Sequence, residues 1–372
     1  MKKFFKYLGS LMVLLLSIAL ILIGYLTFRE FRPRAVEPVA INKQFSEQTI
    51  EKHQSISLVT YNIGYAGLGQ TEDFFMDGGK TVQPVNKAMV QQNLTGIEGT
   101  LKELPAMIYL FQEVDRRSQR SYEVNQEEEL QKQLQLNSAF AYNFKVDYVP
   151  IPWPPIGRVE SGLLTLSNEK ITEAKRIALP NPFRWPVSIS NLKRALLETR
   201  FSIKGTDKEL VVFNLHLEAY DNGDGKIAQS KKLADVLSQE YAKGNYVIAG
   251  GDFNQVFKGS HRYPNLGEAG WAPGEIDPAD LPKHFSLAYD DQQPTVRVLN
   301  KPYTGSYETS QVYVIDGFIV SDNVAVHSVK TKDEQFKYRS PTCEDGSWVK
   351  IEKVQTVLVA CTVCTFYFTD SL

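Results

Sequence analysis

The chain has 372 residues, a formal net charge of −2 and 43% hydrophobic residues. This length and apolar content suit one large domain with a sizeable core. The near-neutral charge excludes the general basic excess that marks most nucleic-acid-binding proteins, although a local basic groove would be compatible with it. All three cysteines lie at or after Cys343, so no disulfide framework holds the body of the chain, and its core must stabilise it.

The N-terminus predicts a membrane anchor. Residues 1–7 form a short basic segment, and the apolar run from Leu8 to Phe28 is long enough to cross a hydrocarbon core of about 30 Å. A cleaved signal peptide, which is the alternative, has an apolar region of about 7–15 residues that ends in small residues. This run ends in Tyr25-Leu26-Thr27-Phe28 instead. We therefore expect an uncleaved single-pass protein of the cell membrane, with its large domain outside the cytoplasm.

Residues 29–54 are polar and contain proline, which is typical of a tether, and residues 55–338 alternate short apolar strands with amphipathic stretches. Periodicity predicts helices over Lys87–Leu104, Gln126–Leu136 and Lys226–Tyr241. It predicts strands over Ile56–Tyr61, Met107–Phe111, Gly162–Ser167, Ala195–Ser202, Leu210–Leu215, Tyr246–Ala249 and Val314–Val320. This mixture favours an α/β (α+β) domain in which sheet packs on sheet with helices outside.

One loop has an unusual composition. Tyr148–Gly157 reads YVPIPWPPIG, and its four prolines exclude a helix or a central strand. Two interpretations stay open: the loop packs back on the body, or Trp153 and its apolar neighbours project to touch a lipid surface or cap the substrate.

Five segments place polar residues at the ends of apolar strands, where a rigid sheet can direct them into one cleft. They are Thr60-Tyr61-Asn62, Phe111-Gln112-Glu113-Val114-Asp115, Phe213-Asn214-Leu215-His216-Leu217, Gly250-Gly251-Asp252-Phe253-Asn254 and Val314-Ile315-Asp316-Gly317-Phe318. Each segment alone has an ordinary explanation as a turn, a cap or a core residue. Five of them in this order indicate a site.

This ordered series resembles the signature of the endonuclease/exonuclease/phosphatase (deoxyribonuclease-I-like) superfamily, over roughly Ile56 to Asp322. The resemblance implies a four-layer α/β/β/α sandwich of two packed mixed sheets, which the transmembrane helix would precede. It also implies divalent-metal-dependent hydrolysis of a phosphodiester or phosphomonoester.

The resemblance implies a role for each motif residue. Asn62 and Glu113 would hold Mg²⁺ or Mn²⁺, a hard cation that prefers oxygen ligands. Asp252 would orient or deprotonate the attacking water, and His216 would donate a hydrogen bond to the developing negative charge. The remaining roles are contacts of Asn254 with the phosphate, substrate binding by Asn214, and support of a second histidine by Asp316. Trp153 is a further candidate for substrate binding, because of the composition of its loop.

That second histidine should follow an aspartate near the C-terminus, and it is absent, because no histidine follows His327. A frame argument explains the loss. Codons TCA CCA ACC TGT GAA GAT GGA AGT TGG encode Ser340–Trp348, and read one base later they give His-Gln-Pro-Val-Lys-Met-Glu-Val. An Arg339 codon that ends in GA places Asp before that His, and suitable codons continue with Gly-Leu-Lys. We therefore interpret residues 339–372 as a frameshifted tail; the alternative is genuine divergence.

Loss of a member of such a site predicts an inactive or impaired enzyme and a final strand that is missing or replaced, with an exposed sheet edge. The expected partners are a phosphoester substrate and, through the N-terminal helix, the membrane, and the chain is expected to be a monomer. A lipid headgroup or small phosphoester is favoured over nucleic acid because the chain lacks excess positive charge. The competing class is a non-catalytic binding or adaptor module at the cell surface.

Overall fold

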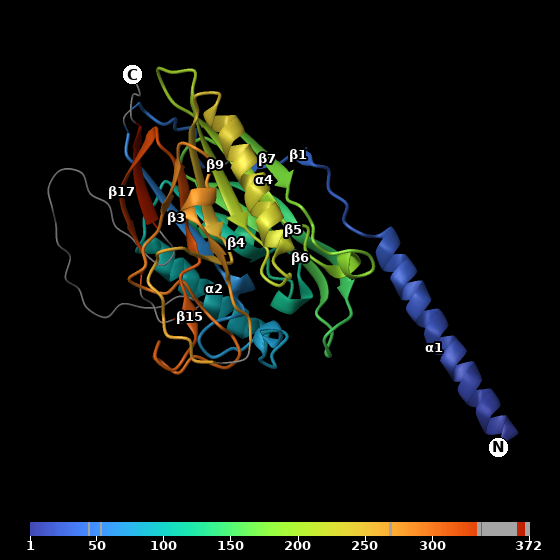
Figure 1. Cartoon of the computed structure of the whole chain (residues 1–372). Helices are drawn as coiled ribbons and strands as arrows, with labels where there is room; N and C mark the ends of the chain where they lie inside the picture. The colour runs from blue at the N-terminus through green and yellow to red at the C-terminus, as the bar shows by residue number, and fades with distance from the viewer. Residues whose placement is uncertain (44, 53, 268–269, 333–335, 337–362, 369–372) are drawn as a thin grey trace.

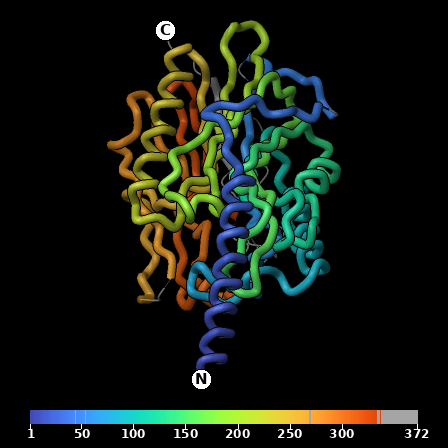
Figure 2. Tube along the Cα trace, turned by 90° about the vertical axis from the view of Figure 1, so that its right-hand side faces the viewer, coloured from blue at the N-terminus to red at the C-terminus, as the bar shows by residue number. Residues whose placement is uncertain are grey.

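The computed structural model describes residues 1–43, 45–52, 54–267, 270–332 and 336, and the backbone of strand 363–368. Two sheets pack face to face, helices cover both outer faces, and helix α1 (Lys2–Phe28) extends away from the body (Figure 1). Seen from the side of α1, the helix runs down the middle, with α4 (Asp224–Tyr241) on the left and teal segments on the right (Figure 2).

Each main sheet has seven strands. The first runs β1 (Val36–Pro38), β7 (Glu173–Ala178), β8 (Ala195–Ser202), β9 (Glu209–His216), β10 (Tyr246–Asp252), β16 (Asp316–Ser321), β13 (Phe285–Ala288). The second runs β17 (Val324–Lys330), β18 (Val363–Phe368), β3 (Ile56–Asn62), β4 (Ile108–Asp115), β6 (Gly157–Ser167), β5 (Asn137–Val149), β2 (Ile41–Asn42). Two small ribbons pair β11 (Gln255–Phe257) with β12 (Gly274–Ile276), and β14 (Val296–Arg297) with β15 (Val312–Tyr313).

The core lies in three layers. Between the sheets, Leu110, Phe201 and Phe318 belong to one cluster with no exposed surface. Helices α2 (Lys87–Lys102) and α3 (Gln126–Leu134) pack their apolar residues on the second sheet. Helix α4 packs Leu233 and Leu237 on the first sheet. The predicted α/β/β/α sandwich is confirmed.

Most predicted elements occur within a few residues of their expected bounds, and the main omission is β5. From Tyr142 to Tyr148 its apolar and polar residues alternate strictly, with Asn143, Lys145 and Asp147 on one face, so the strand signal was present in the sequence and was not recognised. The expected strand over 314–320 begins only at Asp316, because the backbone nitrogens of Ile315 and Asp316 both donate to the Thr295 hydroxyl instead of to a strand.

Residues 29–54, expected as a tether, lie on the domain. Strand β1 pairs with β7 and β2 pairs with β5, so this segment contacts an edge of both sheets. Ile50 is completely buried in the inter-sheet core. This association holds the end of α1 close to the body.

The tail contributes a strand to the second sheet. Strand β18 pairs antiparallel with β17 on one side and with β3 on the other. The expectation of an exposed edge is therefore wrong, because residues from the tail occupy the position beside β3. Of the tail that we interpret as frameshifted, residues 339–372, the parts 339–362 and 369–372 lie outside the described residues.

Gly251 holds the backbone immediately before Asp252 in a conformation that favours glycine. Its φ is +151°, and a Cβ there would lie 2.0 Å from the Leu215 carbonyl oxygen. We expect Gly251→Ala to lower the free energy of unfolding by at least about 2 kcal/mol, since strain of this kind costs about 1–3 kcal/mol before the clash is counted. Urea denaturation monitored by circular dichroism would measure the change.

The matched control for this substitution is Gly99→Ala on α2. Gly99 has open space around its Cβ position, so alanine should raise the stability by about 1 kcal/mol through helix propensity. Equal effects of the two substitutions would contradict a steric requirement at Gly251.

Candidate active site

The sheet topology brings the strand-end motifs together. Asp252 at the end of β10 is in register with His216 on β9 and with Asp316 on β16. On the second sheet, Asn62 at the end of β3 is in register with Gln112 on β4. Because both sheets present these ends at the same rim, five segments far apart in sequence form one site.

Two carboxylates converge on one amide at this rim. The Nδ2 atom of Asn62 donates to Oε1 of Glu113 at 2.9 Å and to Oδ2 of Asp252 at 2.9 Å. The Oδ1 atom of Asn62 accepts from the Gly64 backbone nitrogen at 3.0 Å. Asn62 therefore bridges the two sheets, and it brings two negative charges to within one hydrogen bond of the same nitrogen.

The backbone beside these groups is strained. Glu113 has φ of 54° and Asn254 has φ of 51°, a region that non-glycine residues seldom adopt. Glu113 lies where the register between β4 and β6 shifts, between Phe111 and Val114. A bulge of this kind redirects a side chain, and here it leaves Glu113 lining a cleft while its neighbour Gln112 is completely buried.

His216 and Asn254 complete the polar end of this cleft. His216 is 5% exposed, and its Nε2 lies 3.7 Å from Oδ2 of Asp252. The backbone nitrogen of Asn254 donates to Oδ1 of Asp252 at 2.9 Å, and its Nδ2 donates to the Leu217 carbonyl oxygen at 2.9 Å. Asp252 is thus held through both of its oxygens, which fixes the orientation that a base or a metal ligand requires.

Asn214 does not reach the cleft, which corrects the substrate-binding role that we expected for it. Its side chain has no exposed surface. Its Oδ1 accepts from Gln112 Nε2 at 2.8 Å, and its Nδ2 donates to the carbonyl oxygens of Phe111 and Leu164. These bonds join the two sheets beneath the site, so Asn214 positions the site instead of contacting a ligand.

The structure supports the expected roles of Asp316 and Trp153 only in part. Asp316 is 7% exposed beside Asp252 in the β-ladder, and the histidine that it was expected to support has no counterpart in the sequence. Trp153 is 88% exposed and does not line the cleft, whereas its neighbours Ile151 and Ile156 do.

Sequence reasoning missed two arginines in the cleft wall. Arg120 forms a buried ion pair with Asp115 at 3.0 Å and lies over the ring of Tyr65. Burial alone would lower the pKa of Arg120, but the charge of Asp115 and its hydrogen bond offset this effect, so the pKa is raised. The side chain therefore remains cationic.

The second missed arginine, Arg194, directly precedes β8 and is 4% exposed. Its Nε lies 3.6 Å from Oε2 of Glu218, and its Nη1 is 3.4 Å from the His216 carbonyl oxygen. Two residues after His216, Glu218 also lines the cleft. A basic residue at a strand start was the only sequence signal for Arg194.

The oxygens at this rim fit a hard divalent cation. Glu113 and Asp252 supply carboxylate oxygens. The amide oxygen of Asn62 accepts from the Gly64 backbone nitrogen, so the side chain would have to rotate to present this oxygen to a cation that lies between the carboxylates. Mg²⁺ is commonly bound by one or two carboxylates and keeps several waters. Within the described part of the chain no group of three or more His, Cys, Asp or Glu side chains is arranged to hold a metal ion, so a cation bound here would need water or substrate ligands as well.

The two packed sheets with helices on both outer faces form a fold that this chain shares with solved structures. No family model matches the sequence, and no curated protein matches it. The likeness to known proteins is therefore one of fold.

Solved structures show this likeness at low sequence identity. A functionally unknown conserved protein from Enterococcus faecalis V583 is 15% identical, with a TM-score of 0.50, and the match covers 84% of this chain and 99% of that chain. An endonuclease/exonuclease/phosphatase from Beutenbergia cavernae DSM 12333 is 14% identical, with a TM-score of 0.48 and coverage of 85% and 72%. The human Nocturnin catalytic domain is 14% identical, with a TM-score of 0.46 and coverage of 89% and 97%.

Proposed function

We propose that this chain is built as a divalent-metal-dependent phosphoesterase that hydrolyses a phosphomonoester or phosphodiester. The observation that carries the proposal is the convergence of Glu113 and Asp252 on Asn62, at the end of a cleft that His216 and Asn254 also line. Two carboxylates placed so close together favour binding of a cation, and the neighbouring donors suit an anionic substrate.

The residues divide the chemistry among them. Mg²⁺ or Mn²⁺ held by Glu113 and Asn62 would polarise a phosphoryl oxygen and stabilise the leaving oxygen. Asp252, fixed by the Asn254 backbone nitrogen, would orient the attacking water and accept its proton. His216 would donate a hydrogen bond to the negative charge that develops on the phosphoryl group.

We further propose that α1 anchors the protein in the cell membrane with the domain outside the cytoplasm. Among the described residues, Lys2–Phe28 is the one helix long and apolar enough to cross a bilayer, and almost all of it is exposed. A signal sequence would have the same character, so retention of the helix on the mature chain is the observation that would separate the two. N-terminal sequencing of the protein from its native membrane provides it.

Without the terminal Asp-His pair the site would be impaired. We propose that a frameshift removed this pair from the sequence. The position between β17 and β3 exists in the fold, and a strand that begins after Asp-His-Gln-Pro would suit it. Resequencing the gene across the codons for Phe336 to Ile351 tests this origin: a one- or two-base discrepancy supports it, and an unbroken frame contradicts it.

Metal dependence tests the function. The restored-tail variant is the full chain with residues 339–372 replaced by Asp-His-Gln-Pro-Val-Lys-Met-Glu-Val-Gly-Leu-Lys. We expect it to hydrolyse bis(4-nitrophenyl) phosphate or 4-nitrophenyl phosphate with Mg²⁺ or Mn²⁺, to lose this activity in EDTA and to regain it when the metal returns. Hydrolysis that survives chelation would refute the metal role. Ligand binding without hydrolysis of either ester would favour the adaptor alternative.

A further inference from the structure

The cleft continues from the polar site into a chamber of apolar side chains. The whole cavity has a volume of about 320 Å³. Beyond Glu113, His216 and Asp252, its walls include Phe75, Val149 and Leu192. Phe75 and Leu192 pack against a buried cluster that contains Val149, so these side chains form one apolar section of the wall, with Asn143, Ser190 and Asn191 beside it. A sugar placed against the apolar section would find no hydrogen-bonding partners for its hydroxyl groups there.

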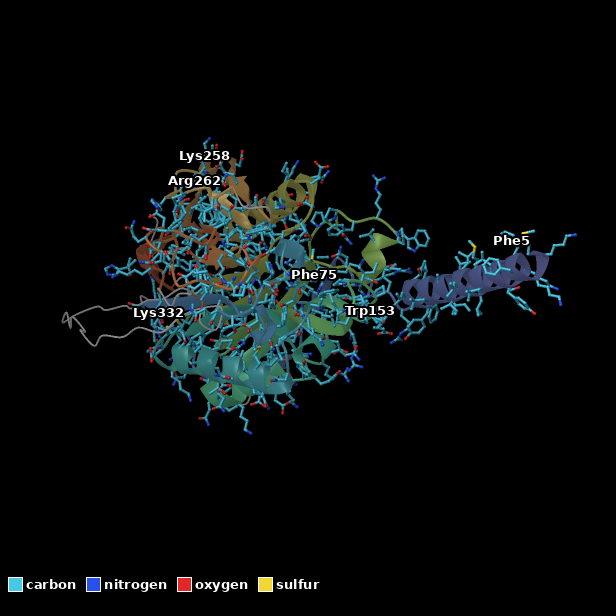
Figure 3. The ribbon with its side chains drawn as sticks, turned by 90° about the horizontal axis from the view of Figure 1, so that it is seen from below. Phe5, Phe75, Trp153, Lys258, Arg262 and Lys332 are labelled. Atoms are coloured by element: carbon cyan, nitrogen blue, oxygen red, sulfur yellow. The ribbon has the colours of Figure 1, made fainter. Side chains whose placement is uncertain are left out.

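The mouth of the chamber lies where α1 joins the domain. Ile151 lines the cavity and is nevertheless 76% exposed, which places it at the entrance. Trp153, Trp185 and Val187 are also largely exposed, at 88%, 62% and 59%. We call these four side chains the apolar rim. Figure 3 shows Trp153 on the side of the domain from which α1 extends, with Phe75 farther into the body.

Polar contacts fix α1 to the same two loops. Asp147, at the end of β5, accepts from the Tyr25 hydroxyl at 2.9 Å and from Arg29 Nε at 2.7 Å. The hydrogen bond and charge of Arg29 lower the pKa of Asp147, so the carboxylate stays ionised near neutral pH. The Trp185 Nε1 donates to the Thr27 hydroxyl at 3.1 Å. The loops that carry the rim are therefore held at the end of α1 that leaves the bilayer.

We propose that the apolar chamber binds the hydrocarbon chain of a membrane lipid phosphoester, which enters over the apolar rim from the bilayer that holds α1. This inference rests on the proposed function, because it assigns that site its substrate class. Exposed indoles beside an anchor suit a membrane interface, where an apolar ring and a polar N–H are both solvated. The phosphate would then meet Arg194 and His216 at the polar end, while the hydrocarbon chain lies along Phe75 and Leu192.

Photolabelling of the full chain in lipid nanodiscs tests this assignment without any need for hydrolysis. The probes are butyl, octyl and dodecyl phosphate that carry a terminal diazirine. Each methylene that leaves water for the chamber should tighten binding by about fourfold. We therefore expect labelling to rise at least tenfold from the butyl to the dodecyl probe, and mass spectrometry to map the label to peptides that contain Phe75 or Leu192.

Two variants and one control separate the chamber from general partitioning into the bilayer. Leu192→Asp places a charge on the chamber wall, and Ile151→Asp places one at the exposed entrance, where folding is not at risk. Both should reduce dodecyl labelling about tenfold. Ile227→Asp is the matched control, because Ile227 is 69% exposed on α4 and does not line this cavity, and its labelling should equal that of the unmodified chain.

The outcomes distinguish this inference from the proposed function. Labelling that does not depend on alkyl length, or that falls equally in all three variants, would refute binding of a hydrocarbon chain in the chamber. This conclusion would hold even if the restored-tail variant hydrolyses small phosphoesters. Length-dependent labelling in the chamber supports it, and would still do so if no phosphoester were hydrolysed, in which case only the enzymatic proposal would fail.

Discussion

The restored-tail variant is expected to hydrolyse phosphoesters about three orders of magnitude faster than the chain with its present tail, because residues of a site that act as a unit lose most of their effect when one is removed. The first five motifs already meet at one rim, with Asp252 held by Asn62 and Asn254. Under the proposed frameshift, the chain lacks an aspartate and a histidine that would lie beside Asp316. The measurement is kcat/KM of both chains at saturating Mg²⁺.

The fold offers a place for the new strand. Strand β18 runs antiparallel to β3, with Val363 opposite Val59, so the residues just before such a strand lie toward Asn62 and the site. A tail whose strand follows directly after Asp-His would bring that pair to the same rim. The control is the same tail with alanine in place of the histidine. Equal rates from the control and the restored tail would show that the pair is not catalytic.

The strand-end motifs were predictable because they depend on local chemistry. An apolar run that ends in Asn62 or in Gly251-Asp252 indicates a buried strand with a polar residue at the rim of the sheet. The parallel register of neighbouring strands then brings such residues together. Sequence alone did not show which of them would face the cleft. Asn214 and His216 lie on the same face of β9, but only His216 lines the cleft. Asn214 is instead engaged by the second sheet, because Gln112 Nε2 donates a hydrogen bond to its amide oxygen.

The apolar chamber and the docking of α1 could not be read from the sequence. Phe75, Val149 and Leu192 meet only because a short 3-10 helix (Phe75–Asp77), the end of β5 and the segment before β8 fold against one another. The bonds of Asp147 to Tyr25 and Arg29 join residues more than a hundred positions apart. The proline-rich loop was recognisable as unusual, yet its place beside the anchor follows from the fold.

Substitution of Glu113 by glutamine should remove both metal binding and activity. In the restored-tail variant, Glu113→Gln is expected to lower kcat/KM by about a factor of 10³, since one preorganised charge at such a site can contribute about 3–4 kcal/mol. The present chain offers a test that needs no activity. At a Mg²⁺ concentration of about 100 times Kd, binding should stabilise the unmodified protein by about 2.7 kcal/mol, and this gain should disappear in the variant.

In the metal-free protein, Glu113→Gln should raise the stability instead of lowering it. Glu113 and Asp252 share the Asn62 amide nitrogen, so their charges repel each other when no cation is present. Neutralising Glu113 should raise the melting temperature in EDTA by about 2 °C for a gain near 1 kcal/mol in a domain of this size. Asp235→Asn on the exposed face of α4 is the control and should change neither value. A variant that keeps its Mg²⁺-dependent stabilisation would show that the cation is bound elsewhere, because the Glu113 carboxylate both repels Asp252 and would hold the cation.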